Sequence, residues 1–323
     1  MIISRTPLRV SFAGGGTDIG DFYRAHGGAV TSTAISKYMY VTVNRKFDSA
    51  IRLSYSKTEN VEKVDEIQHP LVREALKLTG ITKGIEITSM ADVPAQTGLG
   101  SSSAFTVGLL NALYAYKGEF KPPKLLAEQA CHIEIELCKE PIGKQDQYIA
   151  AYGGIQHIQF NKDDTVFVDP VICSLETKKA LEEGMMLFYT GVTRPASAIL
   201  TEQKKQMDEK TEIMKKMKGQ SGLARDALVN GNTAEFGKLL HEGWMMKRQL
   251  AGSITSPDID EYYEKALKAG ALGGKLLGAG GGGFLLFYCP SQKQDAVRRV
   301  LSNLKETTIS LEPQGTKIIY VSD

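Results

Sequence analysis

A glycine- and serine-rich segment, residues 94–104 (PAQTGLGSSSA), connects a predicted strand to a predicted helix. Its glycines allow backbone N–H groups to converge on an anion, and the start of the helix adds positive potential. No lysine follows the glycines, which excludes the phosphate loop of P-loop enzymes, and Ser103 stands where a dinucleotide-binding motif has its third glycine. A tight turn capped by serine is the alternative. Three consecutive hydroxyls, which can also hold Mg²⁺, favour a site for the phosphates of a nucleotide.

Glu134 lies on a predicted helix over residues 123–139, on a face that is apolar three and four residues to either side. A carboxylate on such a face needs a cation, a cage of hydrogen bonds or a proton. From the residues alone, a structural salt bridge and a functional carboxylate are both open. Glu136 has a more solvated setting. The neighbours of Glu134 on its face are Ala130, Cys131, Leu137 and Cys138.

Asp146 lies in the segment 143–148 (GKQDQY), which we expect to be a loop or the start of a helix. Aspartate is a common helix cap, and on its own this residue is more typical of a cap than of a catalyst. A carboxylate at such a position can also accept a proton from a reacting hydroxyl group. Both readings stay open at this point.

These residues have to be positioned by a chain that begins with strands and continues with helices. Alternating apolar and β-branched residues predict the strands, and apolar residues at 3.6-residue spacing predict the helices. We expect a boundary near 165–180, with one domain over residues 1–170 and a second over 171–323. The predicted strands cover 7–12, 39–45, 84–91, 184–190, 273–277, 283–288 and 316–321. The predicted helices cover 101–116, 123–139 and 291–303, with further helical stretches within 196–218, 222–249 and 258–269.

The composition is that of a globular protein that acts on small molecules. The 323 residues are 42% hydrophobic and 24% charged, with a net charge of +2, which does not call for nucleic acid or a membrane as partner. We find no secretion signal and no run long enough to span a membrane, and we expect a cytoplasmic protein whose four cysteines are reduced. The five histidines have no spacing typical of transition-metal sites.

Three segments together resemble the motifs of the GHMP kinases (galactokinase, homoserine kinase, mevalonate kinase and phosphomevalonate kinase). Residues 7–18 (PLRVSFAGGGTD) resemble the first motif, residues 94–104 the second, and residues 275–287 (KLLGAGGGGFLLF) the third, in the order of the family and over nearly the whole chain. The resemblance implies a phosphotransferase that uses ATP and Mg²⁺. It also implies an α+β fold, with an N-terminal half like ribosomal protein S5 domain 2, a ferredoxin-like C-terminal half, and the active site between them.

The resemblance also implies roles for individual residues. Asp146 is the expected catalytic base, and Arg9 would lie against it and add positive charge near the transferred phosphoryl group. Mg²⁺ would be held by Ser102 and by Glu134, which precedes Asp146 by twelve residues, with Ser103 as the reserve ligand. The expected ATP contacts are Thr97, Gly98, Leu99, Gly100, Ser101, Ser102, Ser103, Gly280 and Gly281.

Within the family, the segments GGGTD, GKQDQY and TGVTR are most similar to the bacterial D-glycero-D-manno-heptose 7-phosphate 1-kinases and to the fucose 1-kinases. The implied sugar contacts are Gly16, Thr17 and Asp18. Gly15 and Gly16 stand where galactokinases have Glu and His, which widens the pocket, disfavours galactose and suits a larger sugar. Arg194, beside a predicted helix start, is the first candidate for a distal phosphate. The alternative cations are Lys144, Arg5, Arg24 and Lys37.

The function expected from this resemblance is a kinase for the anomeric (C1) hydroxyl group of a sugar. Heptose 7-phosphate, converted to the 1,7-bisphosphate in the synthesis of nucleotide-activated heptose for surface polysaccharide, is the expected substrate. A fucose 1-kinase and a non-catalytic regulator that binds sugar and ATP are the alternatives. The expected partners are ATP and a sugar phosphate, without nucleic acid or membrane, and a homodimer is left open.

Overall fold

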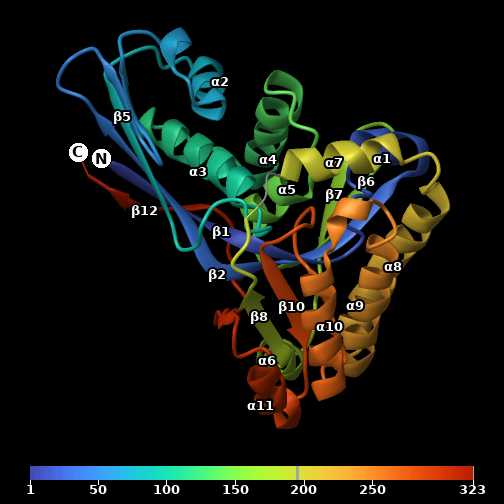
Figure 1. The fold of residues 1–323 in the computed structure, drawn as a ribbon. Coiled ribbons are helices and arrows are strands. Elements are labelled where there is room, and N and C mark those ends of the chain that lie inside the picture. Colours follow the sequence, from blue (N-terminus) through green and yellow to red (C-terminus); the bar gives the residue numbers. More distant parts are fainter. Residues whose placement is uncertain (194–195, 323) are drawn as a thin grey trace.

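The computed structural model describes residues 1–193 and 196–322, which form two β-sheets and the helices that cover them (Figure 1). The larger sheet has the strand order β12-β1-β2-β5-β3-β4, with β6 paired to β2 and β7 paired to β6. Its strands are β1 (Ile2–Ala13), β2 (Gly28–Arg45), β3 (Ile51–Ser54), β4 (Thr58–Val61), β5 (Ile85–Ala91), β6 (Ile155–Phe160), β7 (Val166–Pro170) and β12 (Lys317–Val321).

The smaller sheet is antiparallel throughout, in the order β11-β8-β10-β9. Its strands are β8 (Met185–Tyr189), β9 (Gly273–Leu276), β10 (Phe284–Tyr288) and β11 (Lys305–Glu306). The helices are α1 (Gly20–His26), α2 (Pro70–Thr79), α3 (Ser101–Tyr116), α4 (Pro123–Cys131), α5 (Gln145–Tyr152), α6 (Leu175–Gly184), α7 (Ala196–Lys205), α8 (Thr211–Val229), α9 (Thr233–Lys247), α10 (Pro257–Ala269) and α11 (Ser291–Val300). No helix in the described part of the chain is both long and apolar enough to cross a membrane.

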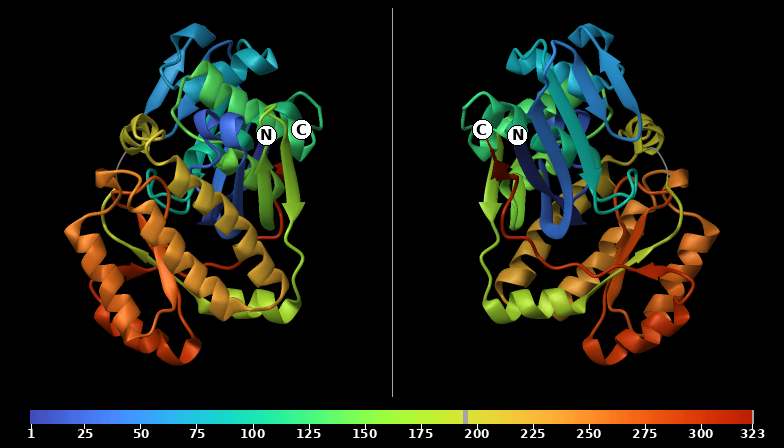
Figure 2. Two further views of the ribbon diagram at one scale, coloured as in Figure 1. Left: turned by 90° about the vertical axis from the view of Figure 1, so that its right-hand side faces the viewer. Right: turned by 90° about the vertical axis from the view of Figure 1, so that its left-hand side faces the viewer.

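The two sheets are joined through the packing of helices and through the last strand. One buried cluster runs from the larger sheet into the smaller one, and a second surrounds Trp244 beneath the smaller sheet. The chain ends by returning β12 to pair with β1, which brings the two termini close together (Figures 1 and 2). The division at residue 170 stays a prediction, and the structure adds that β12, which that prediction assigns to the second domain, belongs to the larger sheet.

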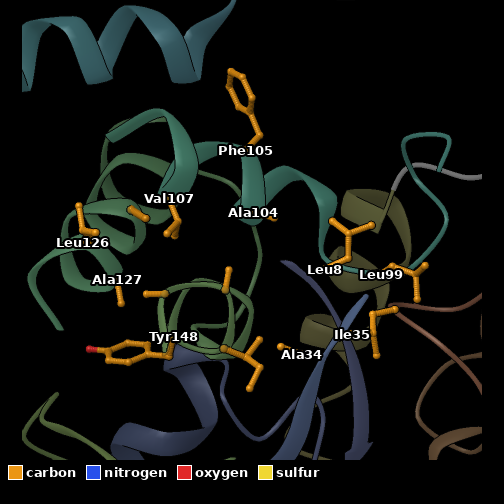
Figure 3. Close-up of a cluster of buried hydrophobic side chains, with 14 of the residues drawn as sticks. Leu8, Ala34, Ile35, Leu99, Ala104, Phe105, Val107, Leu126, Ala127 and Tyr148 are labelled. Carbon is orange, nitrogen blue, oxygen red and sulfur yellow. The ribbon is translucent and has the colours of Figure 1, made fainter. Parts of the chain in front are cut away.

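Helix α3 is the central element that positions the site. Eleven of its sixteen residues are buried, because it packs on β1 and β2 and is covered by α2, α4 and α5. Gly108 allows a close approach to β1: a Cβ atom there would lie 2.5 Å from Thr6 Oγ1. Leu99, directly before the helix, is fully buried in the same cluster as Leu8, and Figure 3 labels both side chains. The start of α3 is therefore fixed to the larger sheet from both sides.

The helix predicted over residues 123–139 differs in its second half. It is an α-helix only as far as Cys131 and continues as a π-helix over His132–Leu137, so the prediction of one continuous α-helix was wrong. A π-helical turn holds an extra residue and re-aims its side chains, and such turns are frequent at functional sites. Glu134 is buried, as its apolar face predicted, but its neighbour Leu137 is 43% exposed because the face shifts at this turn.

Candidate active site

A cavity of about 360 Å³ lies where β1, the start of α3, α5, α7, α9 and β9 meet. Its wall contains most of the predicted site residues: Arg9, Gly16, Asp18, Gly98, Gly100, Ser101, Ser102, Ser103 and Asp146. A wider cavity of about 600 Å³ between α1, β6 and α8 contains none of them. The smaller cavity is therefore the candidate active site.

The predicted phosphate loop leads into α3, which begins at Ser101 as expected. Gly98 and Gly100 have φ values of +82° and +73°, in the left-handed region that glycine adopts readily. A Cβ atom on Gly98 would lie 2.5 Å from the carbonyl oxygen of Leu277, and one on Gly278 would overlap the backbone of Gly98. The loops of the second and third motifs thus touch backbone to backbone, which only glycines permit.

Arg9 and Asp146 form a bidentate ion pair on the wall of the cavity. Nε and Nη2 of Arg9 donate to Oδ1 and Oδ2 of Asp146, each over 2.7 Å. The third nitrogen, Nη1, donates to the carbonyl oxygen of Gly98 over 2.6 Å, and the backbone N–H of Arg9 donates to Leu99 over 3.0 Å. One guanidinium group therefore fixes the orientation of Asp146 relative to the phosphate loop. The side chain of Arg9 is 7% exposed and that of Asp146 is 22% exposed.

Glu134 lies behind the first turn of α3, where side chains enclose its carboxylate. Ser102 and Thr106 donate to Oε1 over 3.2 and 3.0 Å, and Ser103 donates to Oε2 over 2.8 Å. The amide of Gln147 also donates to Oε2. Burial raises the pKa of Glu134 to about 7, although these hydrogen bonds act in the opposite direction. The predicted metal ligands are therefore in mutual contact.

The oxygen atoms around Glu134 fit Mg²⁺ better than a transition metal. No group of three or more His, Cys, Asp or Glu able to hold a metal ion occurs within residues 1–193 and 196–322. Mg²⁺ is held by one or two carboxylates and otherwise keeps waters and phosphate oxygens. One buried carboxylate beside Ser102, at the phosphate loop, is consistent with that pattern.

Asp18 lies on the cavity wall next to the start of α5. Its Oδ1 accepts from the N–H of Gly16 over 2.9 Å, and its Oδ2 accepts from the N–H of Gln145 over 3.1 Å. Burial raises the pKa of this carboxyl group. Thr17 is fully buried and its hydroxyl donates to the carbonyl oxygen of Gly14 over 2.8 Å, so its side chain holds the loop together instead of facing the cavity.

Other predicted residues lie apart from this group. Gly281 donates its N–H to the carbonyl oxygen of Ile254 over 2.9 Å, and neither Gly280 nor Gly281 forms part of the cavity wall. Arg194 lies outside the described residues. Among the alternative cations, Arg24 and Lys144 are paired with Asp164, and Arg5 lies 3.6 Å from Glu312.

Several residues of the cavity wall were not predicted from the sequence. Lys247 and Lys275 reach the wall from α9 and β9. Ser11 and Gln203 also line it, and Ser11 Oγ and Gln203 Nε2 are buried without a hydrogen-bond partner among residues 1–193 and 196–322. A lysine within the apolar run of the third motif was a visible signal for Lys275. The others depend on contacts between distant segments, which no local pattern contains.

Comparisons with known proteins show the family of the chain. The GHMP kinase N-terminal domain matches residues 67–154, and the GHMP kinase C-terminal domain matches residues 224–307. D-glycero-alpha-D-manno-heptose 7-phosphate kinase of Campylobacter jejuni is 30% identical over 316 residues, which is 92% of each chain. L-fucokinase/L-fucose-1-P guanylyltransferase of Bacteroides fragilis is 27% identical over 92% of this chain and 35% of that protein.

A solved structure shares the fold over its whole length. The D-glycero-D-manno-heptose 1-phosphate kinase from Bacteroides thetaiotaomicron has a TM-score of 0.83 and 24% identity, and the match covers 100% of both chains. The predicted α+β GHMP kinase fold is thereby confirmed. The chain is a member of the GHMP kinase family, a sugar kinase that takes ATP and a sugar as its small-molecule partners and transfers phosphate to an alcohol group.

Proposed function

We propose that this kinase transfers the γ-phosphoryl group of ATP to the anomeric hydroxyl group of D-glycero-D-manno-heptose 7-phosphate. The product would be the 1,7-bisphosphate, an intermediate in the synthesis of nucleotide-activated heptose. The bidentate pair of Arg9 and Asp146 carries the proposal, because it shares the wall of one cavity with Asp18 and the start of α3.

Asp146 acts as the base in the proposed reaction. Each of its oxygens accepts one bond from Arg9 and keeps a lone pair, so the carboxylate can still accept the proton of the attacking C1 hydroxyl group. Arg9 also donates to the carbonyl oxygen of Gly98, which fixes the distance between Asp146 and the phosphate loop. The positive charge of Arg9 stabilises the negative charge that spreads over the transferred phosphoryl group.

Ser102 and Glu134 are the proposed Mg²⁺ ligands. When bound, Mg²⁺ neutralises charge on the β- and γ-phosphate oxygens. Glu134 is well suited to such a role because burial without a cation disfavours its ionised form, as its raised pKa indicates. Ser103, which bonds the same carboxylate, stays the reserve ligand.

The substrate is proposed from the sugar end of the cavity and from the relatives. Asp18 and Gln145 offer polar groups to sugar hydroxyls. Gly15 and Gly16 stand where the resemblance gives galactokinases larger side chains, and the Gln203 amide lies 2.7 Å from the place of a Cβ atom on Gly16. The relative from Campylobacter jejuni is named for heptose 7-phosphate. Arg194 stays the sequence-based candidate for the distal phosphate.

A fucose 1-kinase is the second candidate, because the relative from Bacteroides fragilis carries an L-fucokinase name and matches 92% of this chain. A non-catalytic regulator is disfavoured, because Arg9 is present and bonded to Asp146, and Ser102 is present and bonded to Glu134.

A substrate panel tests the proposal. ATP consumption is measured with heptose 7-phosphate, free heptose, fucose, galactose and hexose phosphates. We expect kcat/KM for heptose 7-phosphate to exceed that for every unphosphorylated sugar by at least about 100-fold, because a site that binds a charged group rejects analogues without it. Preference for fucose would establish the second candidate, and no turnover with any sugar would favour a regulator.

A further inference from the structure

Two buried lysines on the cavity wall bond backbone carbonyl groups. Lys247, the last residue of α9, is 8% exposed, and Lys275 in β9 is 6% exposed. The amine of Lys247 donates to the carbonyl oxygens of Leu276, over 3.3 Å, and Gly278. The amine of Lys275 donates to the carbonyl oxygen of Phe12 over 3.0 Å. Within residues 1–193 and 196–322, neither amine forms an ion pair with a carboxylate.

An ammonium group buried without a counter-charge destabilises the free protein. Burial and the charge of Arg9 lower the pKa of Lys247 to about 7, and burial, Lys247 and Arg9 hold the pKa of Lys275 well below its usual range. Asp146 and Asp18 do not pair with the two amines. Arg9 donates to both oxygens of Asp146, and N–H groups of its own loop and of α5 donate to Asp18. Glu140, the third carboxylate that lines the cavity, is exposed, so among the described residues neither amine is paired with a counter-charge.

The two amines bond backbone carbonyls next to the loops that bound the cavity. Lys247 bonds Gly278, whose loop touches Gly98 of the phosphate loop. Lys275 bonds Phe12, which leads from β1 into the loop that carries Asp18. A phosphate group positioned for transfer, or one carried by the sugar, would lie within this region.

We propose that Lys247 and Lys275 together bind a phosphate group of a substrate and supply its counter-charge. The ligand chemistry is a phosphate dianion, and its source is either the γ-phosphate of ATP or the distal phosphate of the sugar. The inference rests on the proposed function for the second source only, because the first follows from ATP use in the whole family.

Methionine variants provide the first test, because methionine keeps an unbranched apolar side chain and removes the charge. Lys247→Met and Lys275→Met are compared with Lys218→Met, whose amine also bonds a backbone carbonyl, that of His26 over 2.8 Å, but lines the other cavity. Affinities are measured for a non-hydrolysable ATP analogue, ADP, heptose 7-phosphate and free heptose. We expect each cavity variant to lose at least about 10-fold in affinity for one phosphate ligand, the loss of a charge-assisted hydrogen bond. Lys218→Met keeps the wild-type affinities.

Comparing affinities for the four ligands distinguishes the two possible sources of the phosphate group. Weaker binding of the ATP analogue with unchanged ADP binding assigns the lysines to the γ-phosphate. Weaker binding of heptose 7-phosphate with unchanged heptose binding assigns them to the sugar. Unchanged affinity for all four ligands in both variants overturns the inference. That result, together with wild-type turnover of heptose 7-phosphate, leaves the proposed function intact. Wild-type preference for fucose overturns the substrate proposal and leaves the ATP measurements valid.

Two further measurements keep the inference testable if a variant folds poorly. The ligand-free melting temperature should rise by at least about 2 °C in Lys247→Met, because a buried charge is removed. In the wild-type enzyme, titration calorimetry at pH 8 in Mg²⁺-free buffers of different ionisation enthalpy should show proton uptake when the phosphate ligand binds. Of the other charged groups that line the cavity, Arg9, Asp18 and Asp146 are held by the hydrogen bonds above, and Glu140 is exposed. Binding without proton uptake contradicts the proposal.

Discussion

Replacing Gly98 by alanine should separate the two glycine loops, and a matched control isolates that effect. Gly98 and Gly118 have similar φ values of +82° and +75°, so alanine at either position carries a similar strain of about 1–2 kcal/mol. Around Gly118 a Cβ atom would meet nothing within 4 Å. At Gly98 it would lie 2.5 Å from the carbonyl oxygen of Leu277 and 3.1 Å from the backbone nitrogen of Gly278.

The clash at Gly98 cannot be relieved by a side chain, since all three nearest atoms belong to the backbone. Ordinary contact begins at 3.4 Å, so the Leu277 carbonyl and Gly98 must separate by 3.4 − 2.5 Å, about 0.9 Å. A displacement of about 1 Å at a catalytic site can reduce the rate about 100-fold. We therefore expect Gly98→Ala to lower kcat/KM for ATP about 100-fold, and Gly118→Ala to change it less than about 2-fold.

The assay combines steady-state kinetics at varied ATP with thermal unfolding of both variants. The melting temperatures show whether the shared backbone strain is similar, and the kinetics show the cost of separating the loops. Equal kinetics in Gly98→Ala and Gly118→Ala would refute the reasoning, because the contact between the two loops would then not support ATP use.

Three further variants test the acids and one of the lysines. Asp146→Asn should lower kcat by about 100-fold or more and leave ATP affinity nearly unchanged; a defect confined to ATP binding would contradict the role of base. Glu134→Gln should weaken the Mg²⁺ dependence of turnover, and an unchanged Mg²⁺ titration would exclude it as a ligand. For Lys247 the folded pKa is about 7 against 10.5 in the unfolded chain, so the folded state loses its proton first and wild-type stability rises between those pH values. The free energy of unfolding of Lys247→Met should therefore exceed that of wild type by up to about 4 kcal/mol near pH 7. In denaturant titrations this difference should shrink toward about pH 10. A difference that does not depend on pH would show that the amine is not buried in its charged form.

The local features of the fold could be predicted from the sequence. Helix α3 begins at Ser101 because glycine ends the preceding loop and apolar residues follow at helical spacing. Glu134 is buried because its face is apolar. In both cases the information lies within a few residues of the feature.

Pairing between distant segments could not be predicted in this way. The long strand β2 pairs with β6 through its first residues and with β5 through its last, and an alternating pattern does not indicate a change of partner. The π-helical turn at His132–Leu137 packs against α2, and its Glu134 bonds side chains of α3 and α5, contacts that helix propensity does not contain. Lys247 and Lys275 meet only because α9 packs on β9.

The position of the new phosphate on the sugar tests the proposed reaction most directly. The purified kinase is incubated with ATP, Mg²⁺ and heptose 7-phosphate, and the product is analysed by phosphorus and proton NMR. We predict one new phosphorus signal coupled to the anomeric proton, with the 7-phosphate signal retained and no release of inorganic phosphate. A new phosphate coupled to any other proton, or no transfer to heptose 7-phosphate while fucose is phosphorylated, would contradict the proposed function.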